Sequence, residues 1–217
     1  MRILPLLALA VLWSGRAAAQ RVTVENGNVI YRATASVPPR RLPTYGHVRE
    51  ARLSPGGRTV AFIRGTPGDS VETALGRTEA TSLWIVRVDG GPPRMLVRGR
   101  GSDAPERTLA NFQSPWFSPD GARVYFLSSA WVTSSAVHAV DVATGREHYV
   151  IAGNSLEVVP RGEYAGYLMV EQHRYFLAAG SYDWTWLFSP TGREIGPIGE
   201  TDEAIAAFRE TYVKPHR

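Results

Sequence analysis

Two copies of one short turn motif, each placed between apolar segments, constrain the fold of this chain more than any other sequence feature. The first copy lies in residues 48–64 (VREARLSPGGRTVAFIR) and the second in residues 112–128 (FQSPWFSPDGARVYFLS). In both copies a proline sets φ for a turn, and a glycine supplies the positive φ that a tight hairpin requires. The apolar residues beyond the turn alternate with small or polar ones, which is the pattern of a half-buried strand. We therefore predict an antiparallel hairpin in each segment.

Each copy is followed by a second hairpin, so the repeating unit has four strands. In the first unit, the second hairpin has predicted strands at residues 82–88 and 94–97, joined by a turn at 89–91. In the second unit, the strands are at residues 137–142 and 147–151, joined by a turn at 143–145. A third, weaker unit has predicted strands at 156–160, 167–175, 182–189 and 194–198, and one more hairpin precedes the first unit at 28–33 and 41–43. The predicted fold class is all-β, a short or partial β-propeller of about three to four four-stranded antiparallel blades with a C-terminal helix.

The spacing of the turns supports this architecture. The second and third turns lie about 42 residues apart, and about 40 residues is typical of a propeller blade. The first interval, from Ser54 to Ser118, is 64 residues long. Two polar, glycine-containing segments at residues 65–80 and 98–108 lengthen it, and we predict that both are surface loops.

The end of the chain has a helical pattern instead. Thr201 is suited to cap a helix, and two acidic residues follow it where the helix dipole favours them. Ile205, Phe208 and Tyr212 fall on one helix face. We predict a helix at residues 202–213 that covers an open edge of the sheet array.

The strings LSPGGRTVAFIR (residues 53–64) and FSPDGARVYF (residues 117–126) resemble the repeat of TolB-type β-propellers. The same repeat occurs in the propeller domains of prolyl-oligopeptidase-type serine peptidases. The resemblance covers residues 25–155 well and residues 156–200 weakly, and it describes a short or partial member of the family. It implies a periplasmic location and a protein or small-ligand partner bound on a propeller face. Because the sequence predicts fewer blades than the family usually has, we expect an open array, a small ring or half of a ring, with self-association through exposed terminal blades.

The first 19 residues have the pattern of a cleavable signal peptide. Arg2 precedes an apolar stretch from Ile3 to Trp13, and three alanines end at Ala19, so the mature chain is expected to start at Gln20. The alternative, an uncleaved anchor helix, is disfavoured because the apolar stretch is shorter than the roughly 20 residues that span a bilayer. We predict a periplasmic or secreted protein that does not span the membrane after cleavage. The predicted domains are a signal peptide (1–19), a TolB-like propeller-type domain (20–200) and a helical tail (201–217).

Charge and cysteine content exclude several classes of function. The chain has 24 basic and 20 acidic residues, and the basic residues are scattered rather than gathered in a stripe, so no nucleic-acid partner is predicted. It has no cysteine, which excludes disulfides, thiolate metal sites and a lipidated N-terminus. None of the five histidines (His47, His138, His148, His173 and His216) pairs with another ligand at helical spacing, so we predict no metal and no cofactor.

The sequence has no recognisable catalytic set. The Gly-x-Ser-x-Gly pentapeptide of the serine hydrolases is missing from it. Ser128, Ser129, His138 and Asp141 lie close together in the sequence, but positions on predicted strands do not make them a triad. The alternative to a binding protein is a small secreted hydrolase or lyase with a carboxylate-based site at the propeller mouth. Its acids would be residues such as Glu157, Glu163 and Asp183.

Aromatic residues crowd the third unit. Tyr182, Trp184 and Trp186 alternate, so they share one face of a predicted strand, and Tyr175 lies nearby with His173 and Arg174. Packing between blades explains this pattern, and so does a ligand or partner surface. We predict a non-enzymatic binding or interaction module whose candidate site is this set of six residues. Its partner would be an envelope protein or a small ligand; a chain that folds only beside a second chain is a further alternative.

Overall fold

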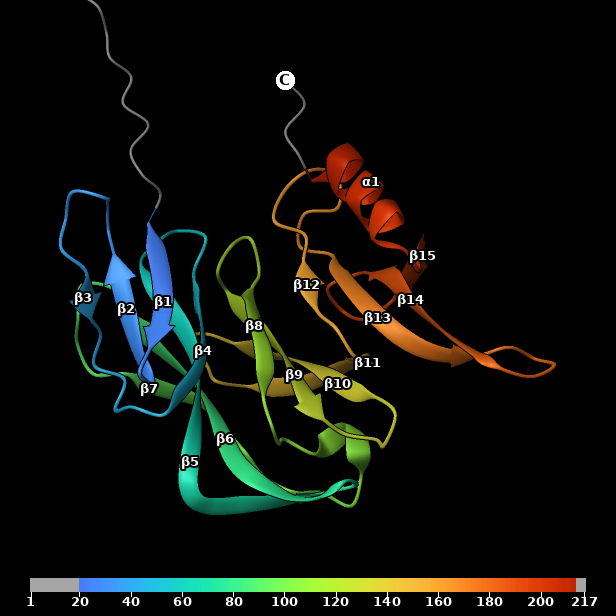
Figure 1. Cartoon of the computed structure of the whole chain (residues 1–217), viewed down its shortest axis with the longest axis horizontal. Helices are drawn as coiled ribbons and strands as arrows, with labels where there is room; N and C mark the ends of the chain where they lie inside the picture. The colour runs from blue at the N-terminus through green and yellow to red at the C-terminus, as the bar shows by residue number, and fades with distance from the viewer. Residues whose placement is uncertain (1–19, 214–217) are drawn as a thin grey trace, which may run out of the picture.

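The computed structural model describes residues 20–213, which form four antiparallel sheets that follow one another in chain order (Figure 1). The predicted signal peptide lies outside the described residues.

The four sheets are called blades 1 to 4 in chain order. Blade 1 contains β1 (Arg21–Glu25), β2 (Asn28–Arg32) and β3 (Arg40–Arg41), and blade 2 contains β4 (Val48–Leu53), β5 (Thr59–Thr73), β6 (Gly76–Arg87) and β7 (Arg94–Arg98). Blade 3 contains β8 (Gln113–Phe117), β9 (Arg123–Ser129), β10 (Ser135–Asp141) and β11 (Glu147–Ala152). Blade 4 contains β12 (Glu157–Val158), β13 (Leu168–Tyr175), β14 (Ser181–Phe188) and β15 (Glu194–Gly199). A 3₁₀ helix, η1 (Pro105–Arg107), precedes β8, and the helix α1 (Asp202–Tyr212) follows β15. The all-β prediction with a C-terminal helix is confirmed.

The serine of the turn motif ties together the two ends of each turn. The Ser54 hydroxyl accepts a hydrogen bond from the Thr59 amide at 3.1 Å, and the Ser118 hydroxyl accepts one from the Arg123 amide at 2.9 Å. Ser189 does the same between β14 and β15. These serines therefore have a structural role, because the side chain satisfies a backbone donor that the turn would leave unpaired.

Two segments differ from the sequence prediction. Most of residues 65–80 is strand rather than loop, because β5 and β6 continue as a paired ribbon to the turn between Thr73 and Gly76. Val71 and Ala80 of this ribbon are buried against Ala110, and this packing explains why the segment is ordered. The strand β1 was not predicted. An Asn-Gly turn with positive φ at both residues joins it to β2, as the right-handed twist of a hairpin favours.

Apolar side chains fill the space between neighbouring blades. Strands alternate their side chains, so in β9 Phe126 packs toward blade 2 whereas Leu127 packs toward blade 4. Blades 2 and 3 are thus covered on both faces. Within residues 20–213, the buried clusters join only blades that are consecutive along the chain, so the described blades form an open array.

The helix α1 covers the free face of blade 4. Ile205 and Phe208 pack against Met169 and Leu187, on the side opposite blade 3. Thr201 caps the helix by accepting a hydrogen bond from the Ala204 amide at 3.2 Å. The helix therefore covers the outer face of the last described sheet, next to its edge strand β15, which is the open end of the array that the prediction named. The face is covered because its apolar residues would otherwise contact water.

A chain of polar groups that runs from a buried histidine to the surface links blades 2 and 3. His138 on β10 is fully buried, and its Nδ1 lies 2.6 Å from Oε1 of Glu147 on β11. The other Glu147 oxygen pairs with Arg100, which follows β7, at 3.2 Å. Burial alone would raise the pKa of Glu147. The hydrogen bond from His138 and the charges of His138 and Arg100 outweigh burial, so the pKa lies below its ordinary value of 4.5.

This lowered pKa predicts a specific dependence of stability on pH. The ionised Glu147 should stabilise the fold at neutral pH, and its contribution should be lost as the pH falls below about 4.5 and through the folded-state pKa. At pH 7, Glu147→Gln should lower the free energy of unfolding by about 1–3 kcal/mol. Urea denaturation of both proteins between about pH 7 and pH 3 measures the effect. Stability curves that stay parallel over this range would contradict the assignment.

Candidate functional site

All six predicted site residues lie on the hairpin of β13 and β14, which projects from the end of the array (Figure 1). The two strands pair without a register shift from Leu168 opposite Phe188 to Tyr175 opposite Ser181. The Phe176 amide donates to the Gly180 carbonyl at 3.1 Å and closes the connecting turn. The hairpin is thus a regular ribbon that holds its side chains in defined positions.

The structure divides the predicted residues between the two faces of this ribbon. The face toward blade 3 carries Arg174, Tyr182, Trp184 and Trp186. His173 and Tyr175 lie on the opposite face, with ring centroids 5.0 Å apart. The structure therefore brings four of the residues together and separates them from the other two.

An aromatic ladder, formed by Phe176, Tyr182, Trp184 and Trp186, runs along the face toward blade 3. Successive ring centroids lie 4.6, 5.1 and 6.3 Å apart. Trp186 is only 8% exposed, whereas Phe176 at the other end is 54% exposed. The ladder is therefore part of the core at one end and part of the surface at the other. Packing between blades therefore accounts for the Trp186 end of the aromatic pattern, whereas the Phe176 end is exposed.

Arg174 anchors the buried end of the ladder. Its guanidinium carbon lies 3.6 Å from the Trp186 ring centroid, and its Nη2 donates to Glu194 at 2.6 Å. Its Nε donates to Gln172, whose own amide donates to the Ala152 carbonyl of blade 3 at 2.6 Å. The charge of Arg174 is thus neutralised within the fold, and the hairpin is tied to the preceding blade.

The opposite face carries an imidazole–carboxylate pair. His173 Nδ1 lies 2.8 Å from Asp183 Oδ1, and the two side chains are 22% and 56% exposed. A carboxylate in this position orients an imidazole, which is one component of a general acid–base site. Among residues 20–213, no group of three or more His, Asp or Glu side chains is placed to hold a metal ion.

The polar residues considered for catalysis have separate partners. The Ser128 hydroxyl donates to the Thr108 carbonyl at 2.8 Å, Asp141 accepts hydrogen bonds from Thr144, and His138 is bound to Glu147, so these side chains do not form a triad. The acids of the carboxylate alternative are also spread out. Glu157 on β12 pairs with Arg209 of α1, Asp183 pairs with His173, and Glu163 lies in the exposed turn before β13.

A charged and aromatic group on the innermost strands was missed by the sequence analysis. Arg52 on β4 lies with its guanidinium carbon 3.4 Å from the ring centroid of Trp116 on β8. Glu50 accepts a hydrogen bond from the Ser114 amide at 2.8 Å. Burial lowers the pKa of Arg52, against the opposing effect of Glu157 and Glu50. These contacts join residues of different blades, so no local pattern in the sequence signals them.

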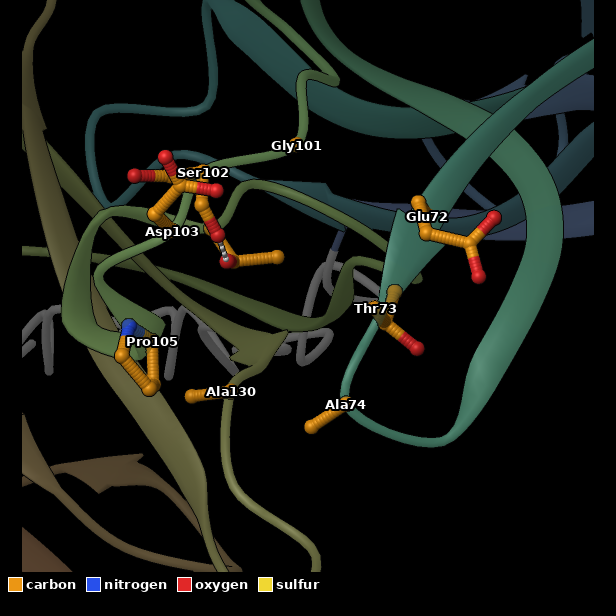
Figure 2. A pocket seen from close by; sticks show the side chains of 9 residues that line it. Glu72, Thr73, Ala74, Gly101, Ser102, Asp103, Pro105 and Ala130 are labelled. Atoms are coloured by element: carbon orange, nitrogen blue, oxygen red, sulfur yellow. Dashed lines mark hydrogen bonds between the residues drawn. The ribbon is translucent and has the colours of Figure 1, made fainter.

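A polar hollow of about 540 Å³ lies between the end of the β5–β6 ribbon and the segment before η1. Figure 2 shows Glu72 and Thr73 on one side of this hollow, with Ser102 and Asp103 on the other. Glu72 is largely exposed and pairs with Arg77 at 3.5 Å. This arrangement brings no set of catalytic or ligand-binding groups together.

Comparison with known proteins shows which solved structures have a similar fold. No family model and no curated protein matches the chain. Among solved structures, TolB from Acinetobacter baumannii matches with a TM-score of 0.54 and 14% identity, over 81% of this chain and 38% of that chain. The β-propeller domain of the trilobed protease from Pyrococcus furiosus matches with a TM-score of 0.50 and 9% identity, over 78% of this chain and 49% of that chain. An uncharacterized protein from Listeria monocytogenes matches with a TM-score of 0.52 and 10% identity, over 87% of this chain and 53% of that chain.

These matches and the blade arrangement show that the described residues have the fold of a short or partial β-propeller. The resemblance to TolB-type propellers that the turn motif predicted is confirmed at the level of the fold by the match to TolB. The chain spans only about two fifths of the length of that TolB structure. In the part of the chain that the structure describes, no helix has the length and apolar character needed to cross a membrane.

Proposed function

We propose that this chain is a periplasmic or secreted propeller module that binds an envelope component through the β13–β14 hairpin without catalysing a reaction. One observation carries the proposal. Tyr175, Phe176 and Leu177 are consecutive, apolar and exposed at the end of a regular ribbon. Exposed apolar groups of this kind mark interaction sites because water solvates them poorly. The signal-peptide pattern of residues 1–19 and the similarity of the fold to TolB support the proposed location.

The alternative is a small secreted hydrolase or lyase, and the His173–Asp183 pair is the observation in its favour. Such a site needs a second carboxylate or a nucleophile close to the pair. Glu157 is engaged by Arg209, on a different strand from the pair. Binding is therefore the better supported of the two functions.

The binding proposal predicts that one charge at the hairpin tip weakens binding strongly. Leu177→Asp should weaken binding of the mature protein to an isolated bacterial envelope fraction by at least about tenfold, because a carboxylate would have to be desolvated in the contact. Co-sedimentation with the envelope fraction measures the effect. Leu75→Asp is the matched control, since Leu75 is 67% exposed at the turn of the β5–β6 ribbon. Equal binding by the two variants would contradict the proposal.

A further inference from the structure

We infer that the tip of the β13–β14 hairpin, residues 175–182, inserts into the surface of a phospholipid bilayer. The inference rests on the proposed function and names the chemistry of the partner. The loop between β13 and β14 extends beyond the other blades, so the tip is free to approach a flat surface (Figure 1). Three kinds of observation support the inference: the exposed fractions of the side chains, the distribution of charge, and the rigidity of the ribbon.

The exposure of the apolar side chains decreases from the connecting loop along the strands of the hairpin. Leu177 is fully exposed in the connecting loop, and the neighbouring Tyr175 and Phe176 are 69% and 54% exposed. Behind them the aromatic ladder continues through Tyr182 to Trp184, both half-buried. An exposed aliphatic residue in the loop, with aromatic rings behind it on the strands, matches the polarity profile of a bilayer interface, where Tyr and Trp are enriched at the headgroup level.

The charges on the hairpin are set back from the tip. None of residues 175–182 is charged, and the charged residues that flank them are Arg174 and Asp183. Each has a partner within the fold, Glu194 for Arg174 and His173 for Asp183. Insertion of the tip therefore requires no charge to enter the apolar layer. It also requires no anionic lipid, because no cation at the tip is left to bind one.

The composition of the tip favours a lipid surface over a protein pocket. Between Leu177 and Tyr182 the tip offers two alanines, Gly180 and the hydroxyl of Ser181, which are few groups for specific hydrogen bonding. A protein partner is normally recognised through a shaped pocket with matched polar groups. A bilayer interface needs only exposed apolar area and interfacial aromatic rings. The regular pairing of β13 and β14 holds this area in place before binding, which reduces the entropy lost on contact.

A second copy of the chain is the main competing occupant. An apolar groove of about 190 Å³ lies between α1 and β15, lined by residues such as Tyr164, Pro197 and Phe208. If the tip of one copy filled the groove of another, the protein would self-associate through the same residues. The experiment must therefore separate lipid binding from association of the protein with itself.

The test uses the mature chain and sucrose-loaded vesicles of phosphatidylcholine alone. We expect the protein to sediment with these vesicles, and to do so equally at about 0.1 M and 0.5 M NaCl because no ion pair with lipid is involved. Leu177→Asp should weaken this binding by at least about tenfold, and Leu75→Asp should leave it unchanged. In Phe176→Trp, the added indole should show a blue-shifted emission that lipids brominated in the acyl chain quench.

Three results would overturn the inference. Absence of vesicle binding, together with envelope binding that Leu177→Asp still weakens, would show that the hairpin has a partner other than the bilayer, and would leave the proposed function intact. Sedimentation-velocity dimers that Leu177→Asp abolishes, without vesicle binding, would assign the tip to the groove of a second copy. Vesicle binding that persists unchanged in Leu177→Asp would show that a different surface of the protein contacts the lipid.

Discussion

Replacing Phe126 by alanine is expected to lower the free energy of unfolding by about 3–5 kcal/mol. The ring is fully buried between blades 2 and 3, with its centroid 4.8 Å from that of Phe112 and 5.6 Å from that of His138. Its removal leaves a cavity that the two sheets are unable to close, because their spacing is set by many other contacts. Urea denaturation followed by tryptophan fluorescence measures the change.

Phe176→Ala is the matched control for this prediction, because the same atoms are removed from an exposed position. Phe176 lies at the hairpin tip, and its removal should change the free energy of unfolding by no more than about 0.5 kcal/mol. A similar loss in both variants would show that the tip is packed in solution. That result would also remove the main support for the binding proposal.

Substitution of Gly162 by alanine should detach α1 from the end of the array. Gly162 has a φ of +85°, and an added Cβ would lie 1.8 Å from the Tyr212 carbonyl oxygen at the end of the helix. The positive φ costs about 1–2 kcal/mol for an alanine, and the clash adds about 1–3 kcal/mol unless the helix moves. We expect a loss of about 2–5 kcal/mol in stability and faster amide exchange in α1.

The control for this second prediction lies four residues away in the same turn. Gly166 has the same φ of +85°, but an added Cβ would meet only Pro119, at an ordinary contact distance of 3.5 Å. Gly166→Ala should therefore show the backbone cost alone, with amide exchange in α1 unchanged. Equal exchange rates for α1 in the two variants would contradict the role assigned to Gly162.

Blade 4 has apolar surface in two places, and only one of them is covered by another element. On the free face of the sheet, α1 covers Met169 and Leu187. At the hairpin tip, Leu177 and its neighbours have no such cover. A fold that covers one apolar surface with a helix and leaves another exposed is the pattern expected when the exposed surface has a partner. The proposed function depends on this contrast.

Part of the candidate site was predictable from the sequence and part was not. Alternation along residues 182–186 placed the three aromatic residues on one strand face, and the structure confirms that placement. Phe176 and Leu177 were not predicted as part of the site, although an uncharged run between Arg174 and Asp183 signals them. The division of His173 and Arg174 between opposite faces follows from simple alternation. Alternation alone does not determine which of the two faces packs against blade 3.

The sequence by itself determined the local geometry of this protein: its hairpin turns, the alternation of its strands and the capped helix near its end. These features depend on residues only a few positions apart, such as Ser118 and Arg123, so each is specified wherever its short motif occurs. Only the tertiary structure decided which surfaces are covered. The pairing of Glu147 with Arg100 and the stacking of Arg52 on Trp116 join residues far apart in the chain, because they arise only when whole sheets pack. The exposure of the hairpin tip has the same origin, since a side chain is exposed only where no other element reaches it.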